Sequence, residues 1–458
     1  MLSLRIRVTM TVMLLLCFSL QAQETTFLSL EAAVDKALEQ NSTLRANKFA
    51  YKKAGWDKIN AWTQLLPRVS LNTRYTWIDD STYALRDFGR FFLDEQGNRL
   101  FPQTAFQESY YTSFDVSMPL FNGAILNGLA FAGAAKDLAK SQLTYTEKAI
   151  VYQVISTYLS AVHAQEVFKL QKEYLQLSGL NYQKAERLQQ AGRYSKLEAL
   201  RWKVEFQQQK SIVSQSGSGL RSALSALARV TSTPMQEKLQ VEDKLPDNLI
   251  QESIRLRNMD DASLLKLIEL NEDELLKANA ALAAAKSSEK MSKHMYRGTY
   301  ANYLPNINLN YSYAWQENNT IDLDLYSPKT LMVNFSWPLF SSFQDFSTTK
   351  ANQYEYKRSQ EQYKDQMQNL HFTLTQTANK LIDLKTQIEL SETNVEYTQN
   401  NYNIVAKQKE KGLVSNIDFI DAKLNWQNAK LSRLKNRYDF ISSMVELYYM
   451  LGKLNKLL

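Results

Sequence analysis

A short segment of alternating polarity occurs twice in the chain. It reads LPRVSLNTRYTW from Leu66 and LPNINLNYSYAW from Leu304, 238 residues later. In both copies apolar and polar residues alternate one by one, which puts them on opposite faces of a β-strand. A second alternating run follows in each copy and closes with Pro-Leu-Phe, at Pro119 and at Pro338. The chain is therefore an internal duplication, and each copy contains a pair of strands.

Each copy continues with a stretch that lacks proline, over residues 120–233 and 339–458. Both stretches are rich in Ala, Gln, Leu, Lys and Glu, which favour helices. Each is interrupted by the motif Gly-x-x-Ser-x-x-acid, at Gly192 and at Gly412. Glycine can end a helix in the left-handed conformation, and the serine can cap the helix that follows. The motif predicts a tip where a long helix of roughly 105 Å, at ~1.5 Å per residue, turns back.

The repeats and motifs define the expected boundaries. The first repeat covers 23–230, a polar linker covers 231–261, and the second repeat covers 262–458. Each repeat includes a helix, at about 43–65 and about 262–303, that ends just before a proline. The first repeat then has strands at about 68–78 and 109–118, long helices at about 120–191 and 196–230, and a tip at 192–195. The second has strands at about 306–316 and 330–337, long helices at about 339–411 and 416–451, and a tip at 412–415.

The N-terminal segment, residues 1–22, is typical of a secretory signal peptide. Two arginines precede an apolar run over 10–20, and Ala22 stands at the expected cleavage position. The run is shorter than the ~20 residues that a membrane-spanning helix needs. Lipidation of Cys17 is disfavoured, because two leucines precede it where small residues would be expected. The sequence therefore predicts an exported chain without cysteine.

Charge and motifs exclude several functions. Removing the two arginines of the signal peptide from 54 basic residues leaves 52 against 47 acidic ones, a formal charge of +5. These charges form no dense basic block, which argues against a nucleic-acid partner. His163, His294 and His371 lack the spacing of metal ligands, and Gly217 and Gly219 lack the preceding strand of a phosphate-binding loop. The sequence predicts no catalytic, metal or cofactor site.

The strands are the only segments of the mature chain that could cross a membrane. Beyond the signal peptide no apolar run is long enough for a spanning helix. Four strands per chain cannot close a barrel, and an open edge in hydrocarbon leaves costly unpaired backbone groups. Three chains would supply twelve strands, with Asn308, Asn310 and Ser312 facing water and the alternate residues facing lipid. The aromatic residues available for the interfacial girdles are Tyr75, Trp77, Tyr110, Tyr313, Trp315 and Trp337.

A second interpretation keeps the hairpins out of the membrane. Short alternating strands are often half-buried hairpins that pack on a soluble protein. The chain would then be a periplasmic coiled-coil scaffold or adaptor. The signal peptide, the duplicated hairpins and the long helices together favour the membrane protein.

Several motifs resemble the TolC-like outer-membrane factor family over nearly the whole mature chain. They are LSLEAAVDKALEQNSTL at 28–44, the Leu-Pro-x-Φ-x-Leu strand openings, the two Pro-Leu-Phe turns and the two glycine tips. The resemblance implies a mainly α-helical homotrimer, with a twelve-stranded β-barrel in outer-membrane lipid that an α-helical barrel continues into the periplasm. It implies an exit duct of a tripartite efflux pump or a type I secretion system. Its partners would be a periplasmic adaptor and an inner-membrane transporter.

The same resemblance assigns roles at the tips. The docking turns would be Gly192, Arg193, Tyr194 and Ser195 in the first copy and Gly412, Leu413, Val414 and Ser415 in the second. Asp418 and Asp421 match acidic residues that ring the periplasmic mouth, with Glu198 as the first copy's counterpart. Capping for Asp418 and a solvated helix face for Asp421 are the alternatives. Family members often have a basic residue at the position of Val414, so the closing network here must differ, and Arg193 is a candidate substitute.

Overall fold

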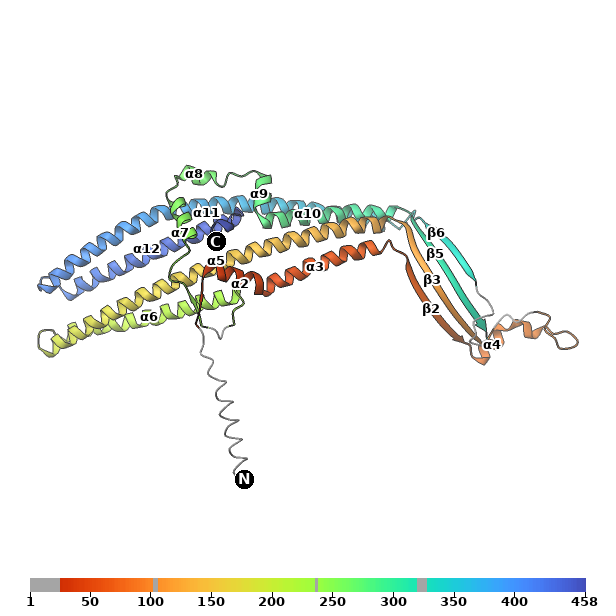
Figure 1. The fold of residues 1–458 in the computed structure, drawn as a ribbon, viewed down its shortest axis with the longest axis horizontal. Coiled ribbons are helices and arrows are strands. Elements are labelled where there is room, and N and C mark those ends of the chain that lie inside the picture. The colour runs from red at the N-terminus through yellow and green to blue at the C-terminus, as the bar shows by residue number, and fades with distance from the viewer. Residues whose placement is uncertain (1–24, 102–105, 235–237, 319–327) are drawn as a thin grey trace, which may run out of the picture. The chain divides into compact units, whose positions relative to one another are not determined.

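The structure, a computed structural model, describes residues 25–101, 106–234, 238–318 and 328–458 (Figure 1). The expected signal peptide lies outside these residues. The chain divides into two units. A helical unit comprises 1–49, 141–284 and 364–458, and a strand unit comprises 50–140 and 285–363. Each unit draws on both sequence repeats.

The strand unit contains one four-stranded antiparallel sheet. Its strands are β2 (Arg68–Trp77), β3 (Glu108–Asn122), β5 (Asn306–Asn318) and β6 (Lys329–Ser336). Their order is β2-β3-β5-β6, so each repeat supplies one hairpin and β3 pairs with β5 to join them. The two outer strands, β2 and β6, each keep one edge without a partner in this sheet.

The register gives the sheet one apolar and one polar face. One row across the four strands is Val69, Val116, Tyr311 and Leu331. The next row is Ser70, Asp115, Ser312 and Thr330. Residues paired across antiparallel strands share a face, and successive residues alternate between faces. The two-residue period of the sequence is thus present across the whole sheet.

The connection from strand to helix in the first repeat differs from the expectation. β3 continues through Pro119 to Asn122, with a bulge between Pro119 and Phe121, so Pro119 is not the turn. A bulge tolerates proline, which has no N–H for the ladder. The helix begins at Gly123, where a Cβ would lie 2.8 Å from Leu304 Cδ1. The Asn122 Oδ1 accepts the Ala124 N–H at 2.9 Å and caps the helix.

The second repeat makes the same connection irregularly. β6 ends at Ser336 and the next helix starts at Gln344, with Pro338 between them. Phe343 has a positive φ of 64° in this connection. Trp337, just beyond β6, donates its Nε1–H to the Tyr303 carbonyl at 3.1 Å. Pro338 therefore lies in an extended turn, several residues before the helix.

Four long helices form two hairpins (Figure 1). The first pair is α5 (Gly123–Gln190) and α6 (Lys196–Val230). The second is α11 (Gln344–Glu410) and α12 (Asn416–Met450). Equivalent helices of the two repeats differ by at most one residue in length, with 68 and 67 residues for the longer helix and 35 for the shorter. Within the described residues, no helix combines the length and the apolar composition needed to cross a membrane.

Short helices precede the first strand of each repeat. In the first repeat they are α2 (Leu30–Gln40) and α3 (Ser42–Thr63), and α3 matches the helix expected at about 43–65. In the second they are α8 (Asp261–Lys266), α9 (Glu272–Ala278), α10 (Ala280–Gly298) and a 3-10 turn (Thr299–Tyr303). Equivalent breaks fall at Asn41 and Asn279. The expectation of a single helix over about 262–303 was therefore wrong.

An asparagine side chain stabilises each break. Asn41 donates to the Val230 carbonyl at 2.9 Å, and Asn279 donates to the Met450 carbonyl at 3.1 Å. Their amide oxygens accept N–H groups of the following helix, from Thr43 for Asn41 and from Leu282 for Asn279. Each asparagine thus caps one helix and satisfies a free carbonyl at the end of α6 or α12.

Two segments that look polar and irregular in sequence are folded. The expected linker contains β4 (Lys238–Val241), which pairs in parallel with β1 (Thr25–Leu28), and α7 (Asp247–Arg257). The first hairpin's loop contains α4 (Asp80–Arg86) and a 3-10 turn (Phe88–Phe91). In that loop Arg99 bridges both oxygens of Asp87, at 3.1 and 2.9 Å, and Asp87 is only 1% exposed.

Candidate functional site at the helix tips

Each tip is a glycine turn that reverses a long helix. Gly192 and Gly412 have φ of 70° and 73°, the left-handed region that L-residues avoid. The next N–H closes the helix end, Arg193 to the Leu188 carbonyl at 2.8 Å and Leu413 to the Gln408 carbonyl at 2.9 Å. This is the six-residue closure of a helix that ends in a left-handed glycine.

The returning helices start with reciprocal caps. The Ser195 hydroxyl accepts the Glu198 N–H, and the Glu198 carboxylate accepts the Ser195 N–H. Ser415 and Asp418 make the same pair of bonds in the second copy. Both serines are N-caps, as the sequence predicts. Hydrogen bonds from Ser415 lower the pKa of Asp418, so this carboxylate stays charged to a lower pH than usual.

The two tips contact each other through Asn416. Its amide donates to the Glu198 carboxylate at 2.8 Å, and its amide oxygen lies 3.5 Å from the Tyr194 hydroxyl. Asn416 is 3% exposed, so its polar atoms need these partners. The Lys409 ammonium lies 5.8 Å from the centre of the Tyr194 ring, within cation–π range. Glu198 therefore caps its own helix and also binds the other hairpin.

A buried ion pair connects the same helices two turns further on. Lys423 of α12 and Glu205 of α6 lie 2.5 Å apart, and their side chains are 2% and 11% exposed. Each is seven residues beyond a partner in the Asn416–Glu198 bond, the spacing at which side chains return to one face of a helix pair. The second oxygen of Glu205 is buried and has no hydrogen-bond partner among the described residues. Sequence analysis missed this pair, although the seven-residue spacing was a usable signal.

Aromatic side chains also connect these helices. Phe419 contacts Trp202 at 6.0 Å and Tyr402 at 5.6 Å between ring centres. Tyr402 stacks on Trp426 at 5.0 Å, and the Lys430 ammonium lies 4.0 Å from the Trp426 ring centre. These contacts join α6, α11 and α12.

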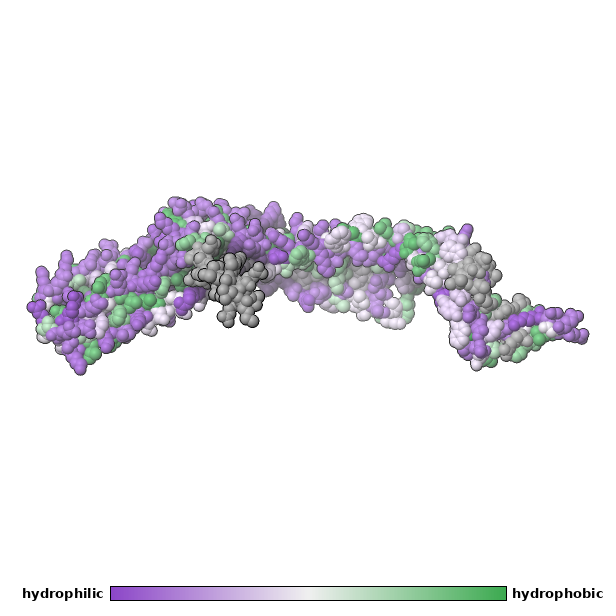
Figure 2. All heavy atoms as spheres, turned by 60° about the horizontal axis from the view of Figure 1, so that its bottom comes forward, coloured by the Kyte–Doolittle hydropathy of each residue, from purple (hydrophilic) through white to green (hydrophobic). Residues whose placement is uncertain are grey.

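The two aspartates of the expected mouth have different surroundings. Asp418 is exposed and holds the cap of α12. Asp421, one turn later, lies beside a groove of about 380 Å³ between α6 and α12. Apolar patches lie among hydrophilic side chains toward the tip end of the hairpins, at the left of Figure 2. The groove's apolar lining residues are Leu197, Leu200, Val204, Ile417, Ile420 and Leu424.

The side chains of the two residues discussed for the closing network make no polar contact within the described residues. The Val414 side chain carries no charge, and its carbonyl is 3.5 Å from the Lys409 ammonium. The Arg193 side chain makes no hydrogen bond or ion pair with the parts of the chain that the structure describes. Asn416 and Lys423 make the contacts between hairpins instead.

The aromatic residues assigned to the girdles lie on the apolar face or next to it. Tyr75 and Tyr110 are paired across β2 and β3, with ring centres 4.9 Å apart. Tyr313 and Trp315 are 4.3 Å apart on β5. Trp77 and Trp337 are 56% and 55% exposed. All six continue the alternate positions that carry the apolar residues of their strands.

The polar face carries a carboxylate that sequence analysis did not single out. Asp115 accepts hydrogen bonds from Asn72 at 2.7 Å, Ser113 at 2.7 Å and Ser312 at 2.6 Å. These donors come from three neighbouring strands and hold the carboxylate in one position. No group of three or more His, Cys, Asp or Glu side chains in the described ranges could hold a metal ion.

Comparison with known proteins agrees with this architecture. Residues 272–453 match the family model for outer membrane efflux proteins. The alkaline protease secretion protein AprF of Pseudomonas aeruginosa is 20% identical over 397 residues, which cover 86% of this chain and 78% of AprF. The family match thus lies in the second repeat, and the resemblance to TolC-like outer-membrane factors is confirmed.

Solved structures show the same fold. The CmeC outer membrane channel of Campylobacter jejuni has a TM-score of 0.77 at 14% identity, covering 93% of this chain and 86% of CmeC. VceC of Vibrio cholerae has a TM-score of 0.75 at 13% identity, covering 92% and 96%. The open state of the Neisseria gonorrhoeae MtrE channel has a TM-score of 0.69 at 16% identity, covering 93% and 89%. The fold is therefore that of channels with a β-barrel and an α-helical barrel.

Proposed function

We propose that this protein is a passive exit duct, which crosses the outer membrane as a homotrimer and extends into the periplasm. The open four-stranded sheet with one apolar face carries this proposal. In hydrocarbon the free edges of β2 and β6 would leave backbone groups unpaired, at several kcal/mol each. Three antiparallel pairings lead from β2 to β6, so these two strands run in opposite directions. β6 of one copy can therefore pair antiparallel with β2 of the next. Three copies then close twelve strands.

Exposed apolar side chains beside both edges support closure by further copies. On α3, next to β2, Trp56, Ile59 and Trp62 are 70%, 49% and 56% exposed. Beyond β6, Phe340 and Phe343 are 75% and 72% exposed. Large exposed apolar patches mark interaction surfaces. In the trimer the first group packs against the second group of a neighbouring copy.

The tips form the periplasmic mouth of the duct. Asp418 and Asp421 of three copies place six carboxylates around it, with Glu198 behind them. A ring of carboxylates attracts cations, so the mouth favours cation entry. The Asn416–Glu198 and Lys423–Glu205 contacts hold the two hairpins of one chain together and keep the mouth closed.

The duct works with two partners. Family members are trimeric channels of tripartite assemblies with an adaptor and an inner-membrane transporter. In this chain the turns 192–195 and 412–415 are the docking surface for the adaptor. Docking opens the mouth only if the adaptor binds the open form more tightly than the closed form. The assembly is an efflux pump or a type I secretion system.

Fractionation tests the proposal against the scaffold alternative. We expect the protein in the outer-membrane fraction, as a trimer that dissociates only on heating in detergent. A soluble periplasmic monomer would contradict the duct and favour a coiled-coil scaffold. Disulfide cross-linking between copies, through single cysteines at Val69 in β2 and Val333 in β6, tests the order of the strands.

A further inference from the structure

A groove between α7, α11 and α12 lies away from the tips, in the helical unit. It has a volume of about 490 Å³, in the range of ligand sites. Ile388, Phe440 and Ile441 form its floor, and each is at most 4% exposed. Ile250 and Ile254 of α7 form one wall. The chain itself already covers this floor, so the apolar surface open to a bound segment is that of α7, where Ile254 is 44% exposed.

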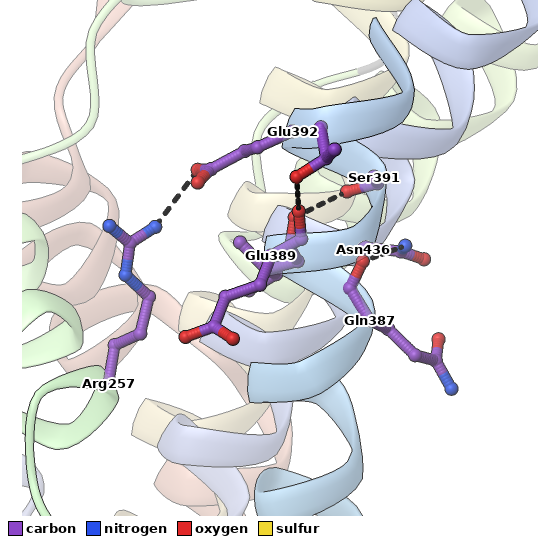
Figure 3. Close-up of polar contacts among 8 residues, drawn as sticks. Arg257, Gln387, Glu389, Ser391, Glu392 and Asn436 are labelled. Atoms are coloured by element: carbon purple, nitrogen blue, oxygen red, sulfur yellow. Dashed lines mark hydrogen bonds and ion pairs between the residues drawn. The ribbon is translucent and has the colours of Figure 1, made fainter. Parts of the chain in front are cut away.

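Some charged side chains of the groove have partners within the described residues, and others have none. Arg257 reaches from α7 to Glu392 on α11 at 3.0 Å, as Figure 3 shows. Glu166 accepts the Tyr438 hydroxyl at 2.9 Å. The guanidinium groups of Arg433 and Arg437, which also line the groove, make no hydrogen bond or ion pair with any residue of the chain that the structure places.

Other basic residues nearby do form ion pairs. These pairs are Arg255 with Glu252 at 3.2 Å, Lys385 with Asp261 at 2.7 Å, and Lys435 with Asp439 at 2.6 Å. Arg433 and Arg437 are one helical turn apart, so both guanidinium groups project from one face of α12. A guanidinium binds a carboxylate through two parallel hydrogen bonds. The groove therefore offers two free carboxylate-binding groups beside an apolar floor.

We propose that this groove binds an acidic polypeptide segment of a periplasmic partner, with carboxylates on Arg433 and Arg437 and a large apolar side chain against Ile254 of α7. The inference rests on the proposed function only for the periplasmic location. A polypeptide fits better than the stem peptides of the cell wall, because those peptides carry carboxylates but no large apolar side chain to cover Ile254. The carboxylate of Glu392 lines the groove on α11, so the acidic residues of the partner lie on the α12 side.

Protection of a single cysteine tests the proposal in the intact trimer. The one natural cysteine, Cys17, belongs to the expected signal peptide. Ile254→Cys should therefore introduce the sole thiol of the mature protein. The probe is a short synthetic peptide with glutamate at every fourth position and leucine between. We expect it to slow maleimide labelling of Ile254→Cys about tenfold, and to leave the exposed control Asn258→Cys unchanged. The same peptide with glutamine for glutamate should protect neither site.

Substitution of the two arginines provides the second arm. Arg433→Gln with Arg437→Gln should lower the peptide's affinity at least about tenfold, since the change removes both charged donors of hydrogen bonds to carboxylates. The control variant carries Arg187→Gln and Arg229→Gln, which remove two positive charges elsewhere in the helical unit. It should alter the peptide's affinity less than twofold. Equal binding by all variants, or no binding to any, would overturn the proposal.

Two other results would also overturn it. Labelling of Ile254→Cys in the monomer but not in the trimer would show that a second copy covers the groove. Protection by a soluble cell-wall stem peptide as strong as that by the leucine-containing probe would assign the groove to the cell wall. Trimer yield and conductance, measured on the same preparations, separate failure of this inference from failure of the duct.

Discussion

Asn416, at the start of α12, donates a 2.8 Å hydrogen bond to the carboxylate of Glu198 in α6. Seven residues further along each helix, Lys423 and Glu205 form a buried ion pair. These two contacts join the hairpins of the two repeats within one chain. Both contacts lie next to the tips, so we propose that they keep the periplasmic mouth closed.

The buried ion pair should reveal its role through single and double substitutions. Lys423→Met leaves Glu205 buried without a counter-charge, which should lower the free energy of unfolding by about 3–5 kcal/mol. Glu205→Leu with Lys423→Met should recover most of this loss, since apolar pairs of similar volume often replace buried ion pairs without cost. Thermal unfolding of the purified protein measures both. If the double variant is as unstable as the single one, the pair contributes more than charge compensation.

The two faces of the sheet should respond differently to charge. Leu309 pairs with Val333 on the apolar face, while Asn308 pairs with Asn334 on the polar face. Leu309→Arg or Val333→Arg should reduce trimer yield, because arginine facing lipid near the midplane costs about 2–4 kcal/mol. Asn308→Arg and Asn334→Arg are the matched controls and should assemble normally. Equal losses at both sets would reject the assignment of the apolar face to lipid.

The loop of the first hairpin should be independent of assembly. Arg99→Ala leaves Asp87 buried without its bidentate partner, so the loop should open locally. We expect faster protease cleavage within residues 79–101 and an unchanged trimer yield. The exposed control Arg86→Ala should leave the cleavage rate unchanged. Loss of the trimer in Arg99→Ala would show that the loop is part of the assembly.

The fold class could be predicted from sequence because its signals are local and repeated. The alternation after Leu66 and Leu304 and the serine caps after Gly192 and Gly412 depend only on near neighbours. The same motifs also identified the family correctly. The charge on Asp418 was correctly linked to capping, because its partner Ser415 is three residues away.

The rest depends on contacts that are distant in sequence. Asn279 lies inside the single helix expected at about 262–303, and its contact with the Met450 carbonyl joins residues that are distant in sequence. The contact of Asn41 with the Val230 carbonyl is of the same kind. The extension of β3 beyond Pro119 depends on pairing with β5 from the other repeat. The carboxylate of Asp115 likewise accepts hydrogen bonds from Asn72 and Ser312 on neighbouring strands. No local pattern marks any of these positions.

The carboxylates of the mouth should control ion selectivity. Asp418→Asn with Asp421→Asn should reduce the cation preference of trimers in planar bilayers and weaken block by multivalent cations. The structure also predicts a pH effect: Ser415→Ala removes hydrogen bonds that lower the pKa of Asp418. That pKa should rise, so the cation preference should be lost at a higher pH than in the unaltered trimer. Unchanged selectivity in the double variant would contradict the carboxylate ring.

The central claim is that the trimer is a duct. The contacts between the two hairpins of each chain hold this duct closed at the tips. Single-channel conductance in planar bilayers tests it most directly. We compare the unaltered trimer with one carrying Asn416→Ala and Lys423→Met, which leaves the buried Glu205 carboxylate without a counter-charge, and use Asn425→Ala, at an exposed position of α12, as the control. We expect a small conductance for the unaltered trimer and the control, and a several-fold larger conductance for the double variant. Intact trimers that conduct no ions in any variant would contradict the duct, and equal conductance in all of them would contradict the closing contacts.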